Sequence, residues 1–303
     1  MGKYLVKRVL LAIVSIIIVS AIAFFTMNLI PGGPFNKEKA QSPEAIKVLE
    51  ERYNLDKPIP QQYVMYMGNL LQGDWGVSLK TGRDIWTDIS SKFSVSARLG
   101  GSAAVVAIIF GIILGSIAAL TRNRLPDRLI VFFTTLGTAM PSFVLATLLL
   151  LVFCLKLGWF PVWTSQDPNY VLPIIALSVY PMAYITRLTK TSMLDALNQD
   201  YVRTARAKGV PRHKVIFMHA LRNALIPVIT YVGPMVAYIL TGSMVVENIF
   251  TIGGLGSAFV TSITNRDYTT IMATTMFLAI LMVIANLLTD IAYKLVDPRI
   301  TFK

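Results

Sequence analysis

Residues 99–120 read LGGSAAVVAIIFGIILGSIAAL, a run of 22 residues without a single charge. An α-helix needs about 20 mostly apolar residues to cross the hydrocarbon core of a bilayer, because each residue advances the helix by only ~1.5 Å. The run therefore predicts a membrane-spanning helix. Gly111 and Gly115 form a G-x-x-x-G pair within it, which predicts that a second helix packs closely against this face.

Similar apolar stretches recur along the whole chain, in which 54% of the residues are hydrophobic and only 15% are charged. Barrel strands are excluded because the runs are too long for them, and lipid offers unpaired backbone groups no partner. We predict an all-α integral membrane protein with six transmembrane helices. The predicted spans are residues 9–30, 99–120, 129–155, 170–186, 224–246 and 271–293.

The amino-terminal stretch imitates a signal peptide, since Lys3, Lys7 and Arg8 precede an apolar run. The run continues to Ile30, beyond the length of a cleaved signal, and this favours an uncleaved first span. Prolines inside helices remove a backbone hydrogen bond and bend or break them. We expect interruptions in three spans, at Pro141, Pro173, Pro181, Pro227 and Pro234.

The distribution of lysine and arginine predicts the orientation, because these residues accumulate on the cytoplasmic side of membrane proteins. With the amino terminus inside, the inner segments hold 17 cations and four acids, whereas the remaining 11 cations face 12 acids. Both termini are therefore predicted to be cytoplasmic. The net charge of +12 then reflects membrane topology, and nucleic acid is not an expected partner.

Several chemistries are poorly supported by the residues present. Cys154 is the single cysteine, and His213 and His219 both lie in a basic loop, so neither a metal centre nor a nucleophilic catalytic pair is expected. The chain has no phosphate-binding loop of the G-x-x-x-x-G-K-[ST] type. Glu247 and Asp290 are expected near the interfaces, so the deep carboxylates typical of ion-coupled carriers are missing. Energy for transport should come from another subunit.

The inner loop, residues 187–223, contains the clearest local signals outside the spans. Asn198 or Asp200 can cap a short helix, and Gly209 suits a left-handed helix end. Pro211 is then placed to begin a second short helix that runs toward Leu221. This pattern predicts a compact two-helix elbow. A basic loop that lies on anionic lipid is the alternative interpretation.

Tyr201-Val-Arg-Thr-Ala-Arg-Ala-Lys-Gly209, followed by Asn223-Ala-Leu-Ile-Pro227, resembles the "EAA" loop of binding-protein-dependent ABC importer permeases, in the form typical of peptide and nickel permeases. Arg203 stands where the family pattern has Glu, and Thr204 where it has the first Ala. The likeness extends over nearly the entire chain. Further matching pieces are residues 31–35, 53–58, 73–76, 141–143, 242–247, 265–268 and 297–299.

The resemblance implies a type I ABC importer permease fold, and it is closest to the B-type subunit of an oligopeptide importer. The implied partners are a second homologous permease subunit, two cytoplasmic ATPase subunits that use ATP and Mg, and an extracytoplasmic binding protein that delivers peptide. This chain itself would bind no cofactor. The implied location is the bacterial cytoplasmic membrane, where the chain would form half of the translocation pathway.

Two sets of residues are candidates for the functional sites. Coupling to the ATPase is expected to involve Arg203, Thr204, Ala205, Arg206, Ala207, Lys208, Gly209, Val210 and Pro211, with Ala205 and Gly209 allowing close approach and Arg206 and Pro211 shaping the joint. Candidates for lining the pathway are Tyr180, Tyr184, Thr241 and Asn286.

The chain is expected to divide into four parts: residues 1–30 with the first span, an extracytoplasmic helical segment 31–98, a permease core 99–295 and a cytoplasmic tail 296–303. Short helices are predicted to start at Ser42-Pro43-Glu44 and at Pro60 in the second part, where they cap the bundle or contact the delivering protein. Dipeptides or nickel are the alternative cargoes. An ion-coupled carrier acting alone and a membrane enzyme are weaker alternatives.

Overall fold

The computed structural model describes residues 2–29, 34, 47–48, 50–51, 53–240 and 244–296. Regular structure within these residues is helical, apart from an isolated bridge between Val77 and Asp84. The all-α prediction is therefore confirmed. The chain forms two compact units, one from segments 1–94 and 257–283 and the other from segments 95–256 and 284–303.

Five helical segments in the described part of the chain are long and apolar enough to cross a membrane, and a bent helix pair would make a sixth. Four helices, α1 (Gly2–Asn28), α4 (Ile85–Leu120), α7 (Val171–Leu197) and α13 (Tyr268–Val296), are longer than the predicted spans because they continue past the apolar runs. For example, the helix that contains residues 99–120 already begins at Ile85, inside the segment predicted to lie outside the membrane.

The first unit contains α1 (Gly2–Asn28), α3 (Ile59–Leu71) and parts of α4 (Ile85–Leu120), α12 (Leu255–Asn265) and α13 (Tyr268–Val296). Its core is a cluster of Phe24, Met27, Leu79, Tyr268 and Met272. The short helix predicted at Pro60 is confirmed as α3, and the one predicted at 42–44 lies outside the described residues. A hydrogen bond of 2.7 Å between the hydroxyls of Ser20 and Tyr63 joins α3 to α1.

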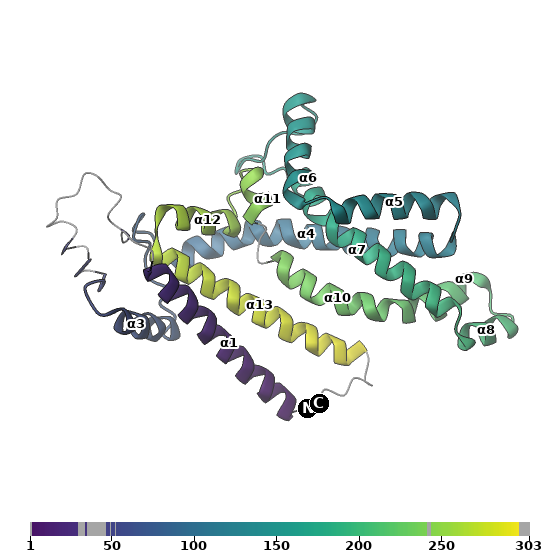
Figure 1. The fold of residues 1–303 in the computed structure, drawn as a ribbon, viewed down its shortest axis with the longest axis horizontal. Coiled ribbons are helices and arrows are strands. Elements are labelled where there is room, and N and C mark those ends of the chain that lie inside the picture. The colour runs from purple at the N-terminus through teal and green to yellow at the C-terminus, as the bar shows by residue number, and fades with distance from the viewer. Residues whose placement is uncertain are drawn as a thin grey trace. The chain divides into compact units, whose positions relative to one another are not determined.

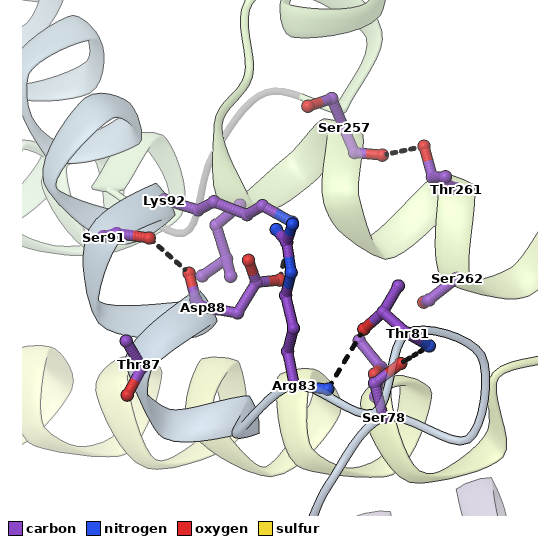
Figure 2. A network of polar contacts seen from close by, with 12 residues as sticks. Ser78, Thr81, Arg83, Thr87, Asp88, Ser91, Lys92, Ser257, Thr261 and Ser262 are labelled. Atoms are coloured by element: carbon purple, nitrogen blue, oxygen red, sulfur yellow. Dashed lines mark hydrogen bonds and ion pairs between the residues drawn. The ribbon is translucent and has the colours of Figure 1, made fainter.

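A polar network fixes the turn that leads into α4 (Figure 2). The Ser78 hydroxyl accepts a hydrogen bond from the Thr81 backbone N–H and donates one of 2.5 Å to the buried Asp267 carboxylate. Asp267 lies just before α13, so this bond ties the turn to the start of that helix. Along α4, Lys92 and Asp88 form an i,i+4 ion pair of 2.6 Å.

The second unit is organised around α7 (Val171–Leu197), which packs against α5 (Leu125–Ala139), α6 (Ser142–Leu149) and α10 (Arg222–Leu240) (Figure 1). A π-helix, η1, continues α6 over Leu150–Lys156, and α11 covers Met244–Ile249. Between α7 and α10 lie α8 (Asp200–Ala207), α9 (Arg212–Lys214) and a second π-helix, η2 (Val215–Leu221).

The G-x-x-x-G prediction is confirmed by the contact between α4 and α7. A β-carbon on Gly111 would lie 2.7 Å from Cβ of Ile185, and one on Gly115 would lie 2.6 Å from the Thr186 carbonyl oxygen. Real β-carbons do not approach other atoms so closely, so only glycine allows the two helices this separation.

The five prolines behave differently from one another. Pro181, Pro227 and Pro234 lie inside continuous helices, and Pro173 is the third residue of α7. At Pro141 the chain bends by 102° between α5 and α6, so the predicted span 129–155 is not one straight helix. Proline has no N–H and disfavours helical geometry in the residue before it, and Met140 is accordingly extended, with φ −82° and ψ 122°.

Glu247 is completely buried in the second unit, and its carboxylate accepts a hydrogen bond of 2.8 Å from the Ser96 hydroxyl. That hydroxyl accepts in turn from the backbone N–H of Leu255, at 2.8 Å. β-Carbons on Gly254 and Gly256 would lie 2.5 and 3.0 Å from Oε2 of Glu247. The Glu247 carboxylate of α11 thus holds α4 and the segment leading into α12 against this helix.

Candidate functional site: the elbow between α7 and α10

The elbow comprises α8, the turn at residues 208–211 and α9, and it follows the end of α7 (Figure 1). Its first helix is amphipathic. Val202 and Ala205 point inward and are buried in a cluster with Met193 and Ala196 of α7 and Val215 of η2. The elbow is therefore packed on the body of the second unit instead of hanging free as a loop.

The turn after α8 has the hydrogen bonds of a Schellman motif. The Val210 N–H donates to the Ala205 carbonyl at 3.2 Å, and the Gly209 N–H donates to the Arg206 carbonyl at 3.0 Å. Gly209 has the left-handed φ of +73° that this motif requires. Val210 packs against the same buried cluster as Ala205. The prediction that Gly209 ends the helix is confirmed.

Pro211 begins the next helix as predicted, with the Val215 N–H donating to its carbonyl at 3.1 Å. That helix is not a separate short one, because α9 continues through η2 directly into α10 at Arg222. The predicted caps are also wrong. The residue before α8 is Gln199, no side chain caps the helix, and Asp200 is its first residue.

The outward face of the elbow is strongly basic. Its exposed cations are Arg203, Arg206, Lys208, Arg212 and Lys214. The Arg203–Asp200 ion pair spans 3.5 Å, and both side chains are largely exposed, so it contributes little to stability. Thr204, Ala207 and Gly209 are also exposed, and the Thr204 hydroxyl donates a hydrogen bond to the Asp200 carbonyl.

The structure brings two of the four pathway candidates together. Tyr180 lines a pocket of about 730 Å³ in the second unit. Tyr184 packs against Tyr231, another lining residue, with the rings tilted by 30° and their centroids 4.3 Å apart. Asn286 is exposed on α13 and is not among the residues that line this pocket. Thr241 lies outside the described residues.

Comparison with known families identifies the chain. The model of the binding-protein-dependent transport system inner membrane component matches residues 111–302, and the model of the amino-terminal part of this membrane component matches residues 1–99. The chain is a member of this permease family.

Relatives of this permease match over its full length. The dipeptide transport system permease protein DppB of Bacillus subtilis (strain 168) is 46% identical over 302 residues, covering 99% of this chain and 98% of the relative. The oligopeptide transport system permease protein OppB of Haemophilus influenzae is 40% identical over 306 residues and covers 100% of both chains. OppB of Salmonella typhimurium is also 40% identical, again over 100% of both.

A solved structure shares the fold of the permease. A chain of the MetNI methionine ABC transporter, in an inward-facing conformation, matches with a TM-score of 0.55, covering 69% of this chain and 96% of that chain. The sequence identity is 14%, so the match concerns the fold alone. The type I ABC importer permease fold expected from the sequence is thereby supported.

The base of the elbow has an anchor that sequence reasoning missed. Lys190 on α7 donates to the buried carboxylate of Asp127 on α5 at 2.5 Å, and Asp127 also accepts from the Asn123 N–H at 3.0 Å. Nearby, the Arg187 guanidinium donates to the Thr135 hydroxyl at 3.0 Å. The signal in the sequence is Asp127 itself, an acid in the first turn of α5 among the cations Arg122, Arg124 and Arg128. These contacts hold α5 and α7 together close to the elbow.

Proposed function

We propose that this chain is a membrane-spanning permease subunit of an ATP-driven peptide importer, and that its elbow receives a cytoplasmic ATPase subunit. The observation that carries the proposal is a basic, exposed surface on a turn that is rigidly packed against α7. A partner that pushes on this surface moves α7 with it, because Val202 and Ala205 are buried against that helix.

The proposed complex contains a second, homologous permease subunit, two ATPases and an extracytoplasmic binding protein. Family membership supports this set of partners, since the matching family is defined as binding-protein-dependent. The charge distribution supports a bacterial cytoplasmic membrane location with both termini and the elbow inside. Within the complex this chain would supply half of the pathway, and ATP with Mg would be used by the ATPases.

The proposed cargo is a peptide, and the relatives support two alternatives, dipeptides and oligopeptides. The relative with 46% identity is a dipeptide permease, whereas the two relatives with 40% identity are oligopeptide permeases. Uptake of labelled dipeptides, of tri- to pentapeptides and of Ni²⁺ by cells that carry the whole importer separates these cargoes. Uptake by this chain alone in liposomes, driven by a proton or sodium gradient, would instead favour an ion-coupled carrier.

Substitution of Gly209 tests docking at the elbow. A β-carbon at this position would meet nothing within 4 Å in this chain, so a large side chain would project outward without a clash. The cost to folding is limited to the left-handed backbone, roughly 1–2 kcal/mol for a residue other than glycine or asparagine. We expect Gly209→Arg to insert and assemble in the membrane but to lose peptide uptake and peptide-stimulated ATP hydrolysis.

Gly209→Asn is the matched control, because asparagine tolerates the left-handed conformation and adds only a short neutral side chain. It should retain most of the uptake. Uptake and stimulated ATP hydrolysis that are normal in the Gly209→Arg importer would contradict docking at this surface. Equal losses in both variants would show that the bulk and charge of arginine are not what blocks the importer, which would also contradict the docking argument.

A further inference from the structure

The pocket in the second unit lies at the break between α5 and α6. It has a volume of about 730 Å³, within the range of sites that hold small ligands. Both sides of the break contribute, together with the middle of α7 and the end of α10, and no lining residue carries a charge near neutral pH. Its aromatic residues are Phe143, Tyr180, Tyr231 and Tyr238.

The break leaves polar backbone groups unpaired at the wall of this pocket. Val144 and Leu145 are the first amides of α6 that bond back, both to the Pro141 carbonyl. Within the described residues, the N–H groups of Ser142 and Phe143 have no acceptor. The carbonyls of Thr138 and Ala139 likewise receive no backbone hydrogen bond across the break, because α5 ends there.

These groups cannot face lipid. An unsatisfied backbone group in hydrocarbon costs several kcal/mol, and irregular backbone at membrane depth is tolerated only where it is covered by protein or lines a wet cavity. The break falls near the middle of the apolar stretch 129–155, so it lies at such a depth. An acyl chain is therefore a poor occupant, whereas a molecule with its own N–H and C=O groups is a good one.

We infer that this pocket binds the transported peptide, with the α5–α6 break pairing to the peptide main chain and the tyrosine rings holding an uncharged side chain. The inference rests on the proposed function and specifies where and how the cargo is held. Main-chain pairing does not depend on the peptide sequence. The lack of charge in the wall gives a charged side chain no counter-ion, so the pocket prefers neutral side chains.

Photo-crosslinking during transport tests the position of the cargo. The photoreactive residue p-benzoylphenylalanine replaces Tyr180 in the complete importer, and the probe is radiolabelled alanyl-phenylalanine or alanyl-phenylalanyl-alanine. Phe132 is the matched control, because it is an exposed aromatic residue on α5 that does not line the pocket. The label is expected at position 180 and not at 132, and only when ATP is present. Crosslinks from position 180 to lipid or to the second permease alone would overturn the inference.

Substitution of Tyr180 by a charged residue gives a second, independent readout. Tyr180→Glu places a carboxylate in the pocket, and Tyr180→Gln is its neutral control of equal size. Relative to Gln, Glu should lower the uptake of acidic peptides against lysine-containing peptides by about tenfold, because a carboxylate in the pocket repels an acidic side chain and attracts a lysine. An unchanged ratio of the two uptakes would overturn the inference.

Failure of this inference and failure of the proposed function give different results. ATP-dependent peptide uptake with no label at position 180 and no change in preference would leave the permease assignment intact. Absence of ATP-dependent peptide uptake by the unsubstituted importer would overturn both.

Discussion

The contact between α4 and α7 allows a comparison of one substitution at two positions of the same helix. Gly115 lies where α4 touches α7, and an added β-carbon would be 2.6 Å from the Thr186 carbonyl oxygen and 2.6 Å from Cβ of Thr189. At Gly101, an added β-carbon would meet nothing within 4 Å. Alanine at the two positions therefore tests whether close helix packing stabilises the second unit.

The cost at Gly115 follows from these distances. Ordinary contacts begin at 3.4 Å, so the shortfall is about 0.8 Å. Neither obstacle is the far end of a flexible side chain, so one helix must shift. Overpacking of this kind typically costs about 1–3 kcal/mol. Alanine also favours the helix over glycine by about 1 kcal/mol, at either position.

The helix-propensity gain cancels when the two variants are compared, so their difference isolates the packing term. We expect Gly115→Ala to be less stable than Gly101→Ala by about 1–3 kcal/mol. At roughly 2–4 °C per kcal/mol, this corresponds to a Tm difference of about 2–12 °C. The measurement is thermal unfolding of the purified importer in detergent. A Tm for Gly115→Ala equal to or above that of Gly101→Ala would refute the packing argument.

Two further substitutions probe the buried polar contacts of the second unit. Lys190→Met removes the partner of the buried Asp127 carboxylate and should destabilise the unit by up to about 3–5 kcal/mol, with most of the loss recovered when Asp127→Asn is added. Thermal unfolding measures both, and a single variant as stable as the double one would contradict the ion pair. Ser96→Ala removes the donor to Glu247 and the acceptor of the Leu255 N–H. In the same assay it should lower the free energy of unfolding by about 1–3 kcal/mol. A variant as stable as the unsubstituted importer would show that these two bonds do not stabilise the unit.

The membrane class and the close helix contact were predictable because they depend on local features of the sequence. Apolar runs of about 20 residues predict membrane-spanning helices. Gly111 and Gly115 lie one turn apart on the same helix face and lack side chains, so they predict the close approach of a second helix. The fate of each proline was not predictable. Pro181 is buried inside α7, which packs against α5, α6 and α10, and the helix continues through it. Pro141 is exposed, and there the chain turns by 102°. Tertiary packing decides between these outcomes, and it is not written in the residues near the proline.

The elbow shows the same division between local and tertiary information. Gly209 and Pro211 act through their own backbone preferences, so their roles could be predicted. The continuation of α9 through η2 into α10 could not, because η2 differs from an α-helix only in its i→i+5 hydrogen bonds, and its seven residues are too few to show a distinct apolar period. Ala205 was expected to allow approach of a partner, but its methyl group is buried against α7. The surface open to a partner is therefore the basic face around Arg206 and Lys208.

The proposed ATPase site and the proposed cargo pocket are connected by two helices. α7 carries Tyr180 and Pro181 at the pocket and ends at the elbow, while α5 begins at the elbow's anchor and ends at the break. The Asp127–Lys190 ion pair joins these helices near the elbow, so a displacement there acts on both. Helices bend most readily where a proline has removed a hydrogen bond, and Pro181 and Pro141 place such points at the pocket itself. Movement at the elbow would thus be converted at the pocket into a change of its walls, as the proposed coupling to an ATPase requires.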